Sequence, residues 1–186
     1  MKDSRLGSYA GLGLILMLGL KAAALTSLLS PLLSEMTDAA SSHVHQVLMG
    51  WTLMGMVWAH TVSRLVPVLL TASLPYGGDL DHAKAKPLAM RASWSNVLAA
   101  VVLTALVAVA LWGCLHLAGW PVPTLLRCLM WSTLAAGVMA RWCRRWFWQR
   151  LGGFTGDTLG ASQQLSEVAA LLAWLAVVHP VGWVRW

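Results

Sequence analysis

The segment "RLGGFTGDTLGASQQLSE", residues 150–167, gathers polar and flexible residues in an otherwise apolar chain. Its glycines allow a sharp turn and a close approach of backbone to a ligand. Exposed backbone N–H groups that precede a helix bind phosphate. Asp157 offers a metal ligand or a helix cap, and Thr155 supplies a second oxygen atom. The pattern indicates either a phosphate-binding and metal-binding loop or a glycine-rich turn that begins the last helix. The glycines concerned are Gly152, Gly153, Gly156 and Gly160.

Three other charged residues are candidates for the same chemistry. Glu167 follows Asp157 by ten residues. On a helix this separation leaves the two side chains roughly 80° apart around the axis but well separated along it. Near the N-terminus, Asp3 and Arg5 offer a metal ligand and a phosphate donor, or a solvated start of the chain.

The composition indicates a membrane protein. Of the 186 residues, 58% are hydrophobic and only 11% are charged, whereas soluble domains carry about 25% charged residues. The net charge of +6 is typical of basic loops on the inner side of a membrane, so we expect no nucleic-acid partner. The segment "RWCRRWFWQR", residues 141–150, is accordingly interpreted as an anchor to anionic membrane lipid.

Five apolar stretches approach the roughly 20 residues that a helix needs to cross a bilayer. They predict an all-α, polytopic membrane helix bundle, with residues 1–186 forming a single membrane domain. The predicted spans are residues 9–33, 47–70, 97–117, 125–140 and 168–184.

The connections between these spans alternate in charge. Threading five helices places nine of the thirteen Lys and Arg residues on one side, which the positive-inside rule makes the cytoplasm. We therefore expect a multi-pass protein of the cell inner (cytoplasmic) membrane. The N-terminus and three polar segments, which include "YGGDLDHAKAK" and the glycine-rich stretch, fall on the cytoplasmic side.

Two basic residues lie inside the predicted spans. Arg64 interrupts the second span, and Lys21 lies midway along the first. Charged residues at membrane depth are costly and tend to face a polar cavity or to extend toward the membrane surface. Both residues are candidates for a polar site or a transport pathway.

The chain resembles the cobalamin synthase family, the adenosylcobinamide-GDP ribazoletransferases, over essentially its whole length. "MKDSRLGSYAGLGLILMLGLKAAAL" is similar to a family segment in which "MRDSRIGAYG" precedes an apolar helix. "RLGGFTGDTLGASQQLSEVAALL" resembles the family motif GGxTGDxLGA, which a glutamate follows. "SRLVPVLLTASLPYGG" resembles the family's arginine-bearing middle helix, which ends in Pro-Tyr.

The resemblance implies a transferase of vitamin B12 (cobalamin) biosynthesis that depends on magnesium. A hydroxyl of α-ribazole, or of its 5′-phosphate, attacks the phosphate attached to adenosylcobinamide in adenosylcobinamide-GDP, and GMP leaves. Asp157 and Asp3 would share Mg²⁺ ligation, and Glu167 would orient the metal shell or a substrate hydroxyl. Arg5, Thr155 and the glycine N–H groups would contact substrate. Arg64 would pair with one of the acids or face the ligand cavity.

The resemblance covers only the C-terminal two-thirds of a family member. The family's N-terminal third carries an acidic motif of the form DGxADTADG, and no Asp-Gly-x-x-Asp occurs in this chain. We therefore expect an N-terminally truncated member, which would act alone, as an oligomer or with a separate N-terminal half. Two alternatives remain: an inactive or split fragment that serves only as a membrane assembly or binding component, and a transporter-like helix bundle.

Overall fold

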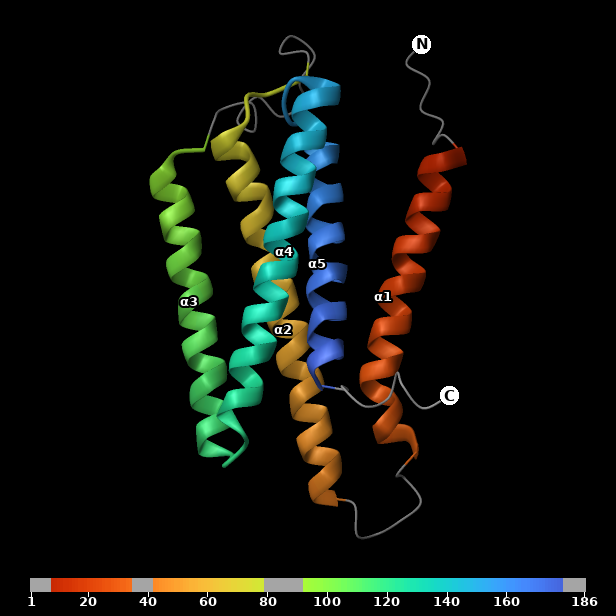
Figure 1. Ribbon diagram of the computed structural model, residues 1–186, viewed down its shortest axis with the longest axis vertical. Helices are drawn as coiled ribbons and strands as arrows, with labels where there is room; N and C mark the ends of the chain where they lie inside the picture. Colours follow the sequence, from red (N-terminus) through yellow and green to blue (C-terminus); the bar gives the residue numbers. More distant parts are fainter. Residues whose placement is uncertain (1–7, 35–41, 79–91, 179–186) are drawn as a thin grey trace.

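The computed structural model describes residues 8–34, 42–78 and 92–178, which form five α-helices (Figure 1). Each helix contains a stretch long and apolar enough to cross a membrane, and the described residues form no strand. The prediction of an all-α, multi-pass membrane bundle is therefore confirmed. The helices are α1 Ser8–Ser34, α2 Ser42–Ser73, α3 Trp94–Leu117, α4 Val122–Leu151 and α5 Gly156–Val178.

Successive helices run in opposite directions, so alternate connections meet at the same end of the bundle (Figure 1). One end gathers the starts of α1, α3 and α5 and the ends of α2 and α4, and we call it the polar end. Arg141, Arg144, Arg145 and Arg150 lie in the last three turns of α4, at this end. Arg127 lies on the same helix near the opposite end.

Helix α4 is longer than the predicted span 125–140. It continues through the basic segment 141–150 because no residue there breaks a helix, and it ends at Leu151. Gly152 then takes the left-handed conformation (φ 66°), and its N–H donates to the Trp148 carbonyl at 3.1 Å. At 1.5 Å per residue, the helix extends roughly 16 Å beyond the apolar part that crosses the membrane.

The predicted fifth span, 168–184, was placed too late in the chain. The described helix α5 runs from Gly156 to Val178, so both Asp157 and Glu167 lie within it. The Ser162 hydroxyl donates to the Leu159 carbonyl at 2.8 Å, and the Ser166 hydroxyl to the Ser162 carbonyl at 2.7 Å. Because these hydroxyls bond within their own helix, a segment with the polarity of a loop can be buried as a span.

Helix α5 packs against both α4 and α2, and together these three helices form the core of the bundle. Small side chains let their backbones approach closely, as in other membrane bundles. Trp174, which is fully buried, fills the space toward α2. Helices α1 and α3 lie on opposite sides of this core and are largely exposed (Figure 1). The buried small residues are Ala59, Ser63, Ser132, Ala136, Ser162, Ser166 and Ala170.

A short backbone junction joins the end of α2 to the α4–α5 connection. The Phe154 N–H donates to the Pro75 carbonyl at 2.9 Å, and the Gly77 N–H donates to the Phe154 carbonyl at 2.8 Å. The Tyr76 and buried Phe154 rings meet edge to face, with centroids 5.7 Å apart. A Cβ atom on Gly153 would collide with the Pro75 carbonyl oxygen, so only glycine fits there. The junction thus fixes where α5 begins.

We expect Gly153→Ala to destabilise the protein by roughly 1–3 kcal/mol, because the added methyl group overpacks a site enclosed by backbone atoms. Gly137→Ala in α4 is the matched control, since its added Cβ would meet nothing within 4 Å. The measurement is the thermal unfolding midpoint in detergent. Equal midpoints for the two variants would show that the close approach at Gly153 is not required.

Candidate functional site

The start of α5 is capped by a pair of threonines. The Thr155 N–H donates to the Thr158 hydroxyl oxygen at 2.8 Å, and the Thr158 N–H donates to the Thr155 hydroxyl oxygen at 3.4 Å. The Leu159 N–H donates to the Thr155 carbonyl at 3.1 Å, which is the first hydrogen bond of the helix. Thr155 is therefore the cap, and the alternative that Asp157 caps the helix is wrong.

This capping leaves Asp157 available to a ligand. Its side chain is exposed in the first turn of α5 and has no partner among the described residues. The N–H groups of Gly156 and Asp157 are also without acceptors in the part of the chain that the structure describes. Gly156 and Gly160 border open space, so a ligand can approach the helix backbone beside the carboxylate. A carboxylate is favourable at this positive end of the helix dipole.

A second group of polar residues lies where α1, α2 and α5 meet, with Glu167 buried and His60 and Arg64 exposed. The Lys21 ammonium nitrogen lies 2.7 Å from Glu167 Oε1. The side chain of Glu167 is only 9% exposed, whereas that of Lys21 is 28% exposed. His60 Nδ1 lies 3.8 Å from the same carboxylate oxygen. These residues border a cavity of about 350 Å³.

His60 links Glu167 to Arg64. The Arg64 Nε–H donates to His60 Nε2 at 3.1 Å, and a guanidinium group can only donate. We call the series Lys21–Glu167–His60–Arg64 the ionic chain.

The members of the ionic chain lie at a similar distance from the polar end. Counted from the polar end, Lys21 is thirteen residues into α1, Glu167 eleven into α5 and His60 thirteen into α2. At 1.5 Å per residue these positions are roughly 17–20 Å from the helix ends. An unpaired carboxylate inside a membrane helix bundle is costly.

The structure thus separates residues that the sequence analysis grouped together. Glu167 and Arg64 belong to the ionic chain, while Asp157 and Thr155 lie at the polar end, roughly 15 Å further along α5. Gly152 ends α4, and Gly153 packs against Pro75. Asp3 and Arg5 lie outside the described residues.

Two members of the ionic chain were less clear from the sequence. Lys21 was recognised as an intramembrane charge, but its partner was not predicted. His60 interrupts the second apolar stretch together with Arg64, but no role was predicted for it from the sequence, although it precedes Arg64 by four residues and so shares a helix face with it. Spacing on one helix could have found the His60–Arg64 pair. The pairing of Lys21 with Glu167 depends on how α1 and α5 pack.

The described residues do not form a metal centre by themselves. No group of three or more His, Cys, Asp or Glu side chains within them could hold a metal ion. Asp157 is the one carboxylate that they place at the polar end, since Glu167 is paired inside the bundle. The predicted Mg²⁺ ligand pair, Asp157 and Asp3, includes a residue outside the described ranges.

The fold and these polar residues define a polytopic α-helical membrane protein. It carries an ionic chain around the buried Glu167 and an exposed carboxylate at one end. Comparison with known proteins identifies the family. The chain belongs to the cobalamin-5-phosphate synthase family, whose model matches residues 1–175.

Individual relatives share one name, adenosylcobinamide-GDP ribazoletransferase. The adenosylcobinamide-GDP ribazoletransferase of Leptothrix cholodnii is 48% identical over 96% of this chain and 58% of its own length. The proteins of that name from Vibrio cholerae and Shewanella piezotolerans are 37% and 35% identical, over 96% and 95% of this chain and 57% of their own lengths. The chain thus spans less than three-fifths of these relatives. No solved structure matches it.

We expect Lys21→Met to lower stability by about 1–3 kcal/mol, because it leaves the Glu167 carboxylate without its ion-pair partner. The double variant Lys21→Met/Glu167→Gln should recover most of this loss, since both charges are then absent. Lys21→Arg is the control that keeps the positive charge. The coupling energy comes from the unfolding midpoints in detergent of the wild type, the single variants Lys21→Met and Glu167→Gln, and the double variant. If the effects of the two substitutions simply add, the pair does not stabilise the fold.

Proposed function

We propose that this chain provides the membrane-embedded catalytic part of an adenosylcobinamide-GDP ribazoletransferase. The substrates are adenosylcobinamide-GDP and α-ribazole or its 5′-phosphate. The products are adenosylcobalamin or its 5′-phosphate, together with GMP. The observation that carries the proposal is the family match over residues 1–175, which includes the exposed Asp157 and the glycine-bordered start of α5.

The reaction is a phosphoryl-group exchange. The ribazole hydroxyl oxygen forms a bond to the phosphorus atom attached to cobinamide, the bond from that phosphorus to the GMP oxygen breaks, and the hydroxyl proton is released. Such a reaction needs in-line positioning and cations that stabilise the developing charge. Asp157 would accept the hydrogen bond of the attacking hydroxyl, and the N–H groups of Gly156 and Asp157 would donate to phosphate oxygens.

The two acidic residues of α5 would then have different roles. Asp157 is exposed and would touch the substrate. Glu167 lies roughly 15 Å away along the helix, so it would act as a positioning residue that holds α1 against α5 through Lys21. Arg64, which is exposed, would hold His60 in place beside Glu167. Roles for Asp3 and Arg5 in metal and phosphate binding remain predictions.

Mg²⁺ remains a prediction from the resemblance. Asp157 alone does not form a magnesium site, and the described residues add no second carboxylate beside it. Magnesium sites commonly combine one or two carboxylates with substrate phosphates. We therefore derive no step through the metal.

Two alternatives belong to other classes of protein. One is a membrane assembly or binding component that has no turnover of its own. A transporter-like bundle is less well supported, because transporter sites of this kind use interrupted helices, and each described helix is continuous, including α2 through Pro67.

The test is a chimera in which this chain replaces the matching segment of the Leptothrix cholodnii relative. Membranes that contain the chimera should convert adenosylcobinamide-GDP and α-ribazole 5′-phosphate to the joined product, detected by mass spectrometry. Asp157→Asn should lower the rate about 10²–10⁴-fold but lower the unfolding midpoint only slightly, because the side chain contacts no described residue and loses only its interaction with the helix dipole.

The matched control is Gln164→Ala, which changes another exposed polar residue of α5 and should keep the rate within about twofold. Assaying this chain alone, beside the chimera, separates the complete enzyme from a component. A folded chimera without activity would count against the proposed reaction, and full turnover by Asp157→Asn would remove that residue from the site.

We also propose that the polar end faces the cytoplasm of a cell with this protein in its inner membrane. Four arginines between Arg141 and Arg150 lie there, against Arg127 near the other end among the described residues of α4. This asymmetry supports the orientation, because basic residues are retained on the cytoplasmic side.

Single cysteines test this orientation in a background with the exposed Cys114 replaced by Ser. In intact cells, a membrane-impermeant maleimide should label Leu117→Cys, at the end of α3 opposite the polar end, and should not label Gln149→Cys. Both cysteines should react after the membrane is opened. The reverse pattern in intact cells would place the polar end outside.

A further inference from the structure

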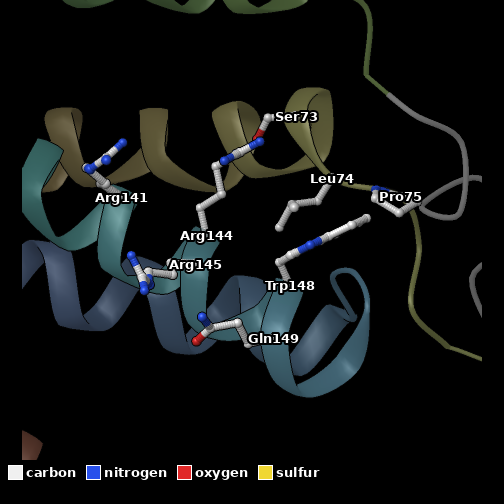
Figure 2. A pocket seen from close by; sticks show the side chains of 8 residues that line it. All are labelled: Ser73, Leu74, Pro75, Arg141, Arg144, Arg145, Trp148 and Gln149. Carbon is white, nitrogen blue, oxygen red and sulfur yellow. The ribbon is translucent and has the colours of Figure 1, made fainter.

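A basic cavity lies beside the junction at the polar end (Figure 2). It has a volume of about 590 Å³, and its lining includes Arg141, Arg144, Arg145 and Trp148 from α4. Ser73, at the end of α2, and Pro75, which follows it, line the other side of the cavity. In Figure 2, Arg144 extends toward Ser73 and the Trp148 ring extends toward Pro75. This volume is within the range of small-molecule sites, about 300–1,000 Å³.

The spacing of the α4 residues directs them to one face. Arg141, Arg144, Arg145 and Trp148 follow the pattern i, i+3, i+4, i+7, which places all four side chains along one stripe of a helix. Like charges at these spacings repel and destabilise a helix by about 0.2–0.5 kcal/mol per pair. The arrangement therefore weakens the isolated helix, and a bound anion would relieve the repulsion.

No acidic residue among those the structure describes compensates these charges. Arg141, Arg144 and Arg145 form no ion pair or hydrogen bond within the described ranges. The ion pairs there belong to Glu167, inside the bundle. Guanidinium groups bind phosphate oxygens through paired, charge-assisted hydrogen bonds, and the exposed Trp148 ring offers a flat face for stacking.

We propose that this cavity binds a phosphate-bearing ligand, with Arg144 and Arg145 as the principal donors. Three cations exceed the charge of a single phosphodiester, so a diphosphate fits better than one lipid headgroup. The ligand chemistry has two sources, which are the diphosphate of a soluble nucleotide-containing molecule and the phosphates of anionic lipid. The stacked Trp142 and Trp146 rings, on the neighbouring face of α4, suit the membrane interface. The proposal concerns binding alone and does not rest on the proposed reaction.

The test uses the full chain in neutral detergent. Isothermal titration calorimetry with inorganic pyrophosphate, and separately with GDP, measures the soluble source. Retention of phosphatidylglycerol by protein from mixed phosphatidylglycerol and phosphatidylcholine nanodiscs, measured by native mass spectrometry, tests the lipid source. Wild-type protein should bind at least one of these probes, and the affinity should fall as ionic strength rises.

The variant Arg144→Gln/Arg145→Gln should weaken that binding at least tenfold. Its unfolding midpoint should stay unchanged or rise, because it removes repulsion and no contact. Arg127→Gln, at the opposite end of α4, and Arg150→Gln, at the same end but outside the lining, are matched controls that should stay within twofold. Trp148→Leu should weaken GDP more than pyrophosphate if a base stacks on the ring.

Binding of pyrophosphate or GDP that depends on Arg144 and Arg145 supports the soluble source. Retention of phosphatidylglycerol alone, with the same dependence, supports the phosphate site and assigns its source to lipid. The proposal is overturned if wild-type protein binds none of the probes. It is equally overturned if Arg127→Gln or Arg150→Gln weakens binding as much as the double variant, because the effect would then be one of net charge.

Discussion

A carboxylate near the middle of a membrane span must be neutralised by the protein, and the contact of Glu167 with Lys21 does this. The rest of the fold depends on that contact. It lets α5 cross the membrane with an acidic residue inside, and it ties α1 to the core. The second half of α1 is held further by its buried Ala24 and Leu28 and by a hydrogen bond from the Thr52 hydroxyl to the Leu28 carbonyl.

The number of spanning helices could be predicted from the sequence, but the bounds of α4 and α5 could not. Five apolar stretches were enough to predict five spanning helices, because backbone in a bilayer must bond within its own segment. The predicted bounds of α4 and α5 are wrong because the charged residues of 141–150 and Glu167 indicate loops when the sequence is considered alone. Because Lys21 pairs with Glu167, this carboxylate can lie inside a helix of the bundle. The arginines of α4 lie in a helix that continues past the predicted apolar span. The pairing of Glu167 is not visible without the packing, whereas the lack of a helix-breaking residue in 141–150 is visible in the sequence.

The site was predictable to a similar extent. The sequence indicated that "YGGD" and "GGFTGD" meet at one end, and the bond between Gly77 and Phe154 confirms that their glycine ends do. It did not indicate that Thr158 completes the cap of α5, because that depends on where the helix begins. Nor did it separate Asp157 from Glu167 into an exposed residue and a buried one. Burial follows from which helix faces α1, which the spacing of two residues on α5 cannot determine.

Stability and ligand contact are therefore assigned to different parts of α5. Inside the bundle, Ser162, Ser166 and Glu167 are satisfied by their own helix or by a neighbouring helix. At the polar end, Asp157 and the α4 arginines have no partner among the described residues. The repulsion among the arginines opposes folding. Residues kept in such a state are typical of sites whose partner arrives from outside the chain. The junction at Gly153 holds the ends of α2 and α4 beside the start of α5. Asp157 and the α4 arginines are therefore kept at the same end of the bundle by backbone contacts, without an ion pair between them.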